Sequence, residues 1–250
     1  MLQTSTAQAD TQRHIVNVDE QEYLLREYVG VAPKRGIYVE GNEANGNSLP
    51  QGFLVSQPPH STTRAHFHES NQFQVFVDGD GHFGKQPAAP LTVQYANGHT
   101  PYGPIKAGSN GIMYFTLRQR WDPGAKYMPQ MRDRLVRGNQ RQRLVGAPQL
   151  LSAQALAQVE SAHTQTLIEP EPDGLYALLC TLGSGQLMQL EDAARGGGQY
   201  HVVVNGALLG DADSALDRWS CQYAFPEDGE VPVQAAQGGA QVLILRFPKL

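Results

Sequence analysis

The sequence of 250 residues predicts an all-β protein built from two related units. Three observations support this prediction. Short β-prone runs alternate with turn residues, the 26 glycines and 16 prolines are spread along the chain, and one segment of the first half recurs in the second half. Many short strands joined by Gly- and Pro-containing turns are typical of β-sandwiches and barrels. Length alone admits one large β domain or two small ones, and the 40% hydrophobic content allows either to bury a sizeable core.

The internal repeat favours two small β units over one large domain. Residues 72–79 (QFQVFVDG) align with residues 199–206 (QYHVVVNG), and residues 107–117 have a counterpart in residues 237–247. A duplicated β unit explains both matches. We therefore expect a flexible tail over 1–13, an N-terminal barrel over 14–120, a basic connector over 121–165 and a C-terminal barrel over 166–250.

The strand predictions follow from local patterns. Residues 72–77 alternate, with Gln72, Gln74 and Phe76 on one face, and Asp78-Gly79 is expected to close the strand in a tight turn over 78–81. No helix is expected before residue 120. Further strands are expected at 23–25, 36–39, 53–55, 91–95, 112–117, 176–180, 199–204, 219–223 and 242–245.

The segment between the repeats is basic. Eight of the 19 Lys and Arg residues lie there: Arg118, Arg120, Lys126, Arg132, Arg134, Arg137, Arg141 and Arg143. A phosphate-binding patch is one interpretation, but base-stacking aromatics are not interleaved, so we favour a solvated linker. Ser152 is expected to cap one short helix over 153–161.

Composition excludes several classes of function. A formal net charge of -5 speaks against nucleic acid as the main partner, and no apolar run has membrane-spanning length. The first four residues lack a charged-then-apolar leader pattern, and Cys180 and Cys221 provide no disulfide framework. We therefore expect a cytoplasmic protein with reduced thiols, and neither a nucleic-acid nor a membrane partner.

The segment His66-Phe67-His68 is the candidate functional site. In an extended strand alternate side chains share a face, so both imidazoles would turn inward while Phe67 packs behind them. Two converging imidazoles can hold a divalent metal. The alternative is a pair of barrel-lining histidines that are hydrogen-bonded to neighbours. The repeat places Ala193 and Arg195 at the equivalent positions, so a metal would bind only in the first half.

These motifs resemble the cupin superfamily, and in particular a bicupin. The first cupin motif, Gly-x5-His-x-His-x3–4-Glu-x6-Gly, aligns with His60, His66, His68, Gln72 and Gly79. The second, Pro-x-Gly-x2-His-x3-Asn, aligns with Pro101, Gly103, Lys106 and Asn110. The resemblance extends from about residue 20 to the C-terminus, apart from the connector. It implies two tandem cupin barrels (double-stranded β-helix or jelly-roll) with one short helix in the connector.

Two positions depart from the family pattern. Gln72 stands for the glutamate ligand and Lys106 for the third histidine, and a protonated lysine cannot ligate a metal. By position, the resemblance implies His66 and His68 as metal ligands with Gln72 as a weak oxygen ligand. His99 is a candidate third nitrogen ligand, and His60 and His82 are weaker ones.

Two functions follow from the resemblance. The first is an enzyme with one Fe, Mn, Ni or Zn ion and dioxygenase-, isomerase- or lyase-type chemistry on a small anionic substrate. Lys106 would hold an acidic group or act catalytically, or would instead reach the mouth of the barrel as a surface lysine. The second is a non-catalytic bicupin that binds a small metabolite without metal. Substrate contacts are expected from Gln74, Phe76, Tyr102, Lys106 and Tyr114, and a homodimer is expected by resemblance.

Overall fold

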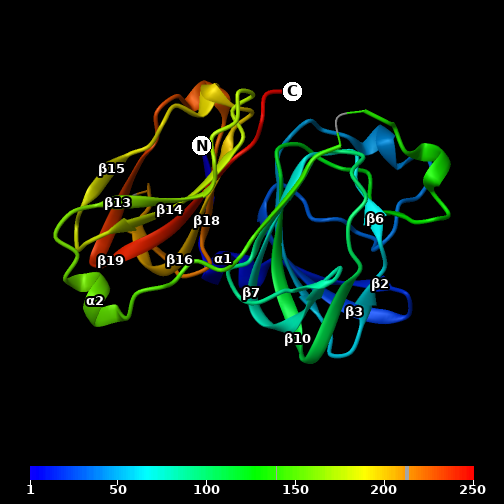
Figure 1. The fold of residues 1–250 in the computed structure, drawn as a ribbon, viewed down its shortest axis with the longest axis horizontal. Helices are drawn as coiled ribbons and strands as arrows, with labels where there is room; N and C mark the ends of the chain where they lie inside the picture. The colour runs from blue at the N-terminus through cyan, green and yellow to red at the C-terminus, as the bar shows by residue number, and fades with distance from the viewer. Residues whose placement is uncertain (139, 212–213) are drawn as a thin grey trace. The chain divides into compact units, whose positions relative to one another are not determined.

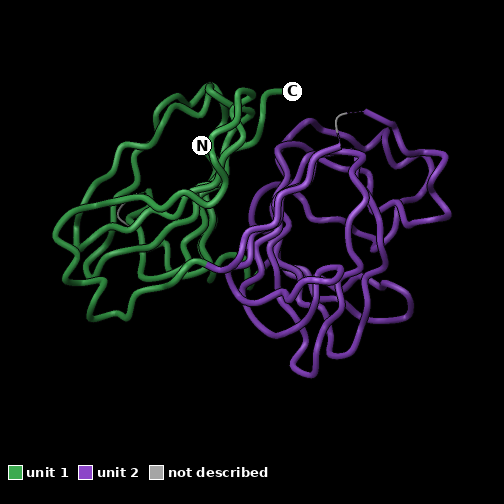
Figure 2. Tube along the Cα trace, in the orientation of Figure 1, with its two compact units in different colours: residues 1–11, 148–250 green, residues 12–147 purple. Residues whose placement is uncertain are grey.

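A computed structural model describes residues 1–138, 140–211 and 214–250. The chain divides into two compact β units (Figure 2). The N-terminal unit comprises residues 12–147, and the C-terminal unit comprises residues 148–250 together with residues 1–11. The prediction of a β protein with two related units is confirmed, although the chain has a few short helices rather than the single one expected. Among the described residues, no helix is both long and apolar enough to span a membrane.

The N-terminal unit is built on one large antiparallel sheet (Figure 1). Its order is β12-β9-β7-β10-β4-β3-β2, with β5 paired to β10 and β8 to β7, while β6 and β11 form a separate two-stranded sheet. The strands are β2 (Arg13–Val18), β3 (Gln21–Val29), β4 (Gln51–Gln57), β5 (Thr62–Thr63), β6 (His66–Phe67), β7 (Gln72–Phe83), β8 (Gln86–Pro87), β9 (Val93–Ala96), β10 (Ile105–Arg118), β11 (Lys126–Tyr127) and β12 (Gln142–Val145). The 3-10 helices of this unit are η1 (Asn42–Asn45) and η2 (Arg132–Arg134).

The C-terminal unit repeats this plan. Its main sheet has the order β1-β18-β16-β19-β14-β13, with β15 paired to β19 and β17 to β16. Its elements are β1 (Leu2–Thr4), α1 (Thr6–Thr11), α2 (Ala153–Ala157), β13 (His163–Ile168), β14 (Tyr176–Leu182), β15 (Leu187–Gln189), η3 (Ala193–Arg195), β16 (Gln199–Leu209), β17 (Ala215–Asp217), β18 (Cys221–Ala224), η5 (Pro226–Asp228) and β19 (Pro232–Arg246). Helix α2 begins as predicted, because the Ser152 hydroxyl accepts a hydrogen bond from the Ala155 amide at 3.2 Å, but it ends at Ala157.

The internal repeat is visible in the strand pairing. The neighbours β9-β7-β10-β4 correspond to β18-β16-β19-β14. Gln72 faces Arg118 across β7 and β10, and Gln199 faces Arg246 across β16 and β19. The register therefore identifies Arg118 and Arg246 as equivalent positions, whereas the alignment of residues 107–117 with residues 237–247 set Thr116 against Arg246.

The predicted turn over residues 78–81 is instead a bulged part of β7, which continues to Phe83. Gly79 has a φ of 81°, and a Cβ atom at this position would lie 2.2 Å from the carbonyl oxygen of Gly111. Only glycine fits such a close backbone approach. The positive φ expected for an Asp-Gly turn is therefore present at Gly79. The chain does not reverse there, however, because β7 stays paired with β10 on both sides of this residue.

The first eleven residues correct the expectation of a loose tail and of no early helix. Strand β1 pairs with β18, with Leu2 opposite Tyr223, and α1 buries Ala9 completely. The N-terminal ammonium lies 2.8 Å from Asp228. Strand β1 takes the place beside β18 that β12 takes beside β9. The physical reason is that the backbone of β18 offers an edge whose N–H and C=O groups need partners.

The connector also differs from the expectation. Residues 121–147 belong to the N-terminal unit and contribute β11 and β12, while residue 139 lies outside the described residues. Arg118 and Lys126 are buried, so the interpretation of the whole basic segment as a solvated linker is wrong for these two. Residues 36–39 form no strand. The Tyr38 amide instead donates to the Ala125 carbonyl at 2.9 Å and holds this loop against the segment that leads into β11.

Candidate functional site

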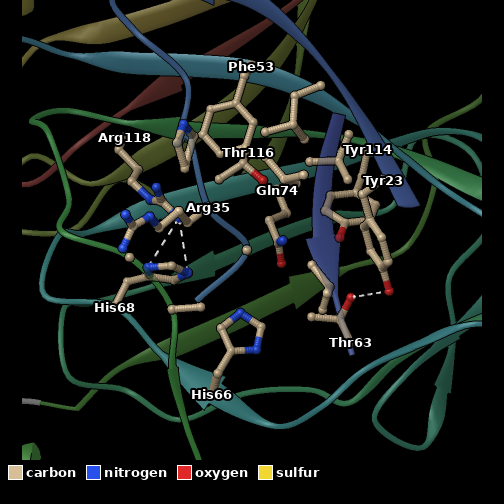
Figure 3. A pocket seen from close by; sticks show the side chains of 18 of the residues that line it. Tyr23, Arg35, Phe53, Thr63, His66, His68, Gln74, Tyr114, Thr116 and Arg118 are labelled. Carbon is tan, nitrogen blue, oxygen red and sulfur yellow. Dashed lines mark hydrogen bonds between the residues drawn. The ribbon is translucent and has the colours of Figure 1, made fainter. Parts of the chain in front are cut away.

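The two histidines of β6 and its exit turn inward together. Their rings are perpendicular, with centroids 5.2 Å apart, and both line an internal cavity (Figure 3). Phe67, between them, is fully buried on the opposite side. Strand β6 is held by β11 and by a bridge between His66 and Tyr102. The geometry therefore agrees with the alternation expected from the sequence.

Each imidazole is oriented by a hydrogen bond from Nδ1. The Nδ1–H of His66 donates to the carbonyl oxygen of Arg64 at 2.7 Å, and that of His68 donates to Oδ1 of Asp122 at 2.6 Å. Because a carbonyl or carboxylate only accepts, the proton is on Nδ1 and the neutral rings have unprotonated Nε2 atoms. For His66, no partner of Nε2 is found among the described residues.

A buried arginine lies against the second histidine. Nη2 of Arg118 is 3.0 Å from Nε2 and 3.2 Å from Nδ1 of His68, so it lies over the ring rather than in line with one nitrogen. The other nitrogens donate to amide oxygens: Nη1 to Oε1 of Gln51 at 2.5 Å and Nε to Oε1 of Gln72 at 3.2 Å. Gln72 in turn donates to the hydroxyl of Tyr102. One guanidinium thus links β4, β7, β10 and the exit of β6.

The carboxylate of Asp122 balances this charge. Oδ1 accepts from His68 and, at 2.9 Å, from the Gly124 amide; Oδ2 accepts from the amides of Glu69 at 2.8 Å and Ser70 at 3.1 Å. Burial by itself would raise the pKa of Asp122, but His68, Arg118 and these hydrogen bonds outweigh it and lower the pKa below its ordinary value. The ionised carboxylate is therefore fully hydrogen-bonded.

Burial acts in the opposite direction on the histidines. It lowers the pKa of His66 to about 3, with the neighbouring His68 adding to the effect. Burial and the charge of Arg118 likewise lower the pKa of His68. Both rings are therefore neutral at neutral pH.

The cavity beside these groups has a volume of about 80 Å³. Gln74 points into it from β7 (Figure 3), and this side chain is 2% exposed with no hydrogen-bond partner for Oε1 among the described residues. The lining side chains and glycines are Val16, Val18, Tyr23, Leu25, Pro33, Arg35, Gly36, Phe53, Val55, Thr63, His66, His68, Gln74, Tyr102, Tyr114, Thr116, Arg118, Gly124, Ala125 and Tyr127.

Several predicted site residues lie at this cavity and others do not. His66, His68, Gln74, Tyr102 and Tyr114 line it. Gln72 is buried beside it in the arginine network, and Phe76 packs in the core against Phe83 and Tyr114. His60 and His82 are exposed.

Lys106 is exposed and does not point into the cavity, which corrects the expectation for it. It has the same parity as Tyr114 along β10, but the register shifts between Ala107 and Ile112 and again after Met113. These bulges break the alternation on which a parity argument depends. His99 also lies away from the cavity lining: its ring packs near Phe67 at 5.6 Å and its Nδ1 accepts from the Val136 amide at 3.3 Å.

The donor set does not fit a metal ion of the kind that the cupin resemblance implies. No group of three or more His, Cys, Asp or Glu side chains within the described part of the chain is arranged to hold one. A metal bound to Nε2 of His68 at about 2.1 Å would lie no more than about 5 Å from Nη2 of Arg118. At that separation a divalent ion and the guanidinium alone repel by an amount on the order of 7 kcal/mol for an effective dielectric constant near 20, and the Asp122 carboxylate on the other nitrogen of the ring offsets part of this repulsion. The contacts match the alternative interpretation of hydrogen-bonded, cavity-lining histidines.

Sequence reasoning missed Arg118, Asp122 and Lys126. All three fall at the start of the segment interpreted as a linker, yet all are buried, and Nζ of Lys126 pairs with Glu69 at 2.9 Å and lies 3.8 Å from the ring centre of Tyr38. The internal repeat held one usable signal. Pairing residues 107–118 with residues 235–246, two positions from the alignment given above, matches Arg118 with Arg246. An arginine at the same strand position in both halves favours a buried role.

No family model matches the sequence, and no curated protein matches it. Solved structures do match in fold. A provisionally assigned dioxygenase from Nostoc punctiforme has a TM-score of 0.58 at 11% identity, covering 94% of this chain and 78% of its own. A cupin 2 conserved barrel domain protein from Leptotrichia buccalis has 0.50 at 11% identity over 92% and 91%. Oxalate decarboxylase from Bacillus subtilis, with Mn(II) centres, has 0.53 at 10% identity over 100% and 78%.

The fold is that of a bicupin, with one cupin unit in each half of the chain. At these identities the likeness establishes the fold, and a fold of this kind carries many chemistries. The function must therefore be argued from the site itself.

Proposed function

We propose that the N-terminal unit is a metal-free binding site for a small molecule. Of the two functions that the sequence suggested, this is the non-catalytic one. The observation that carries it is the carboxamide of Gln74, which is buried at the cavity with an unpartnered Oε1. This oxygen faces the cavity, so it is available to a hydrogen-bond donor on a ligand, which would replace water in that space.

The network behind the cavity supports the same proposal. Arg118 and Asp122, one buried positive and one buried negative charge, both contact the ring of His68. Such a preorganised wall fixes the position of His68 without a metal ion. The unprotonated Nε2 of His66 adds a second acceptor at the cavity.

A metal-loading experiment tests the first half of the proposal. The purified protein is equilibrated in turn with Mn²⁺, Fe²⁺, Ni²⁺ and Zn²⁺, dialysed and analysed for bound metal. We expect no stoichiometric metal that depends on the two inward histidines. The His66→Ala/His68→Ala double variant is compared with His60→Ala/His82→Ala, which removes two exposed imidazoles as a control. One equivalent of metal lost only in the first variant overturns the proposal.

A binding experiment tests the second half. Butyramide, butyrate and pentylammonium have the same number of non-hydrogen atoms and differ in charge. Binding of each is followed by two-dimensional amide NMR of the protein. We expect at least one probe to shift resonances of the cavity wall saturably. Ala125→Leu adds a larger side chain at the half-buried rim and should abolish these shifts. No saturable binding of any probe, or binding that is indifferent to this change, contradicts the proposal.

A further inference from the structure

We infer that the ligand of the N-terminal unit is a small uncharged aliphatic molecule whose head group, such as a primary carboxamide, offers two hydrogen-bond donors. This inference rests on the proposed function and specifies its ligand class. An anionic substrate was expected from the sequence, because a metal ion without its carboxylate ligand would leave the site positively charged. The inferred ligand is uncharged instead.

The size of the ligand follows from the cavity. The cavity volume of about 80 Å³ is several times the minimum of roughly 10–15 Å³ that admits one water molecule. The cavity therefore has room for a few waters or for a short ligand with a small number of non-hydrogen atoms. Sugar nucleotides and aromatic bicyclic compounds are too large for this space as it stands.

The charges around the cavity favour a neutral ligand. The buried cation Arg118 is matched by the buried carboxylate Asp122, and both are joined to His68. The second buried cation, Lys126, is paired with Glu69 at 2.9 Å. A carboxylate or ammonium ligand would therefore bring an uncompensated charge into a site of low dielectric constant, which is unfavourable. Arg35 is exposed at the rim, where solvent screens its charge.

The polar groups at the cavity set the hydrogen-bond pattern. Oε1 of Gln74 has no partner among the described residues, and Nε2 of His66, unprotonated because Nδ1–H donates to Arg64, can also accept a hydrogen bond. On the opposite side, Tyr23 and Thr63 already bond to each other at 3.1 Å (Figure 3). Most of the remaining wall is apolar, including Val55. A head with two N–H or O–H donors and a short alkyl body is complementary to this surface.

The three probes separate the inference from the proposed function. Butyramide should bind at least about tenfold more tightly than butyrate or pentylammonium, because only the charged probes carry the burial penalty. Gln74→Leu should weaken butyramide about five- to tenfold, the effect of one lost hydrogen bond. Gln94→Leu is the matched control. Gln94 is also buried with an unpartnered amide and lies opposite Gln74 on β9, but outside the cavity lining, so butyramide affinity should not change.

Each other outcome has a distinct meaning. Tighter binding of butyrate, lost in Arg35→Ala, would overturn the uncharged class and leave small-molecule binding intact. Tighter binding of pentylammonium would overturn the class in the same way. Equal weakening of butyramide by Gln74→Leu and Gln94→Leu would show that Gln74 acts only through the fold. Failure of all three probes would overturn the proposed function as well.

Discussion

Replacing Arg118 with leucine removes the buried cation that links four segments of the N-terminal unit. The change leaves Oε1 of Gln51 and Oε1 of Gln72 without their donor and leaves the Asp122 carboxylate without its nearby positive charge. Removing one partner of a buried charge network typically costs about 3–5 kcal/mol, because the other charge is left uncompensated. We therefore expect the free energy of unfolding of this unit to fall by about that amount.

Two tryptophans allow this to be measured in one unit at a time. Trp121 belongs to the N-terminal unit and Trp219 to the C-terminal unit. In a Trp219→Phe background, the fluorescence of Trp121 during urea unfolding therefore reports the N-terminal unit. Treating each unit separately matters because a chain with two units need not unfold in a single step.

Arg120→Leu is the control for this experiment. Arg120 is two residues away and exposed, with a long contact of 3.4 Å to the Glu69 carbonyl, so its removal should change stability by no more than about 0.5 kcal/mol. Arg118→Lys keeps the charge but loses the planar set of donors and should fall between the two. A loss below about 1 kcal/mol in Arg118→Leu, or an equal loss in Arg120→Leu, would refute the network as a structural element.

Three further predictions concern pH, the N-terminal residues and the thiols. The pKa of His66 is about 3 in the folded state and about 6.5 in the unfolded state, so between these pH values only the unfolded state binds the proton. The free energy of unfolding therefore falls as the pH decreases, by up to about 1.4 kcal/mol per pH unit. In the His66→Leu variant, the stability of the N-terminal unit, measured by Trp121 fluorescence, should fall less steeply with decreasing pH. An unchanged slope of stability against pH would contradict the lowered pKa of His66. Deleting residues 1–11 should accelerate amide exchange in β18 (Cys221–Ala224) but not in β7, and unchanged protection of β18 would count against the role of β1. Burial raises the pKa of Cys180 to about 12 and that of Cys221 above its usual range, so neither thiol should react with a thiol reagent until the protein is unfolded.

The sequence predicted the site best where local periodicity is undisturbed. Alternation turns His66 of β6 and His68, just after it, to the same side, and it places Gln74 inward on β7. The resemblance offered Lys106 either as an inward residue or as a lysine at the mouth of the barrel, and the bulges of β10, which invert the faces between it and Tyr114, leave it exposed. A bulge is set by cross-strand pairing with β7, which lies outside any local window of sequence.

Charge in the sequence likewise does not reveal burial. Arg118 and Arg120 stand in one basic run, but the first is 2% exposed and the second is exposed. A buried arginine requires partners that fold around it, and here these come from Gln51, Gln72 and His68 on three other parts of the chain. The partners are ordinary polar residues with no pattern of their own.

The β class, the duplication and the inward histidine pair were predictable from local patterns, because strand alternation and repeated segments are local properties of the chain. The cation that lies beside those histidines could not be predicted in this way. Long-range strand pairing brought Arg118 and Asp122 to His68 and turned Lys106 to the surface. The charge balance of a buried site depends on these distant contacts, and it is this balance that favours a metal-free cavity.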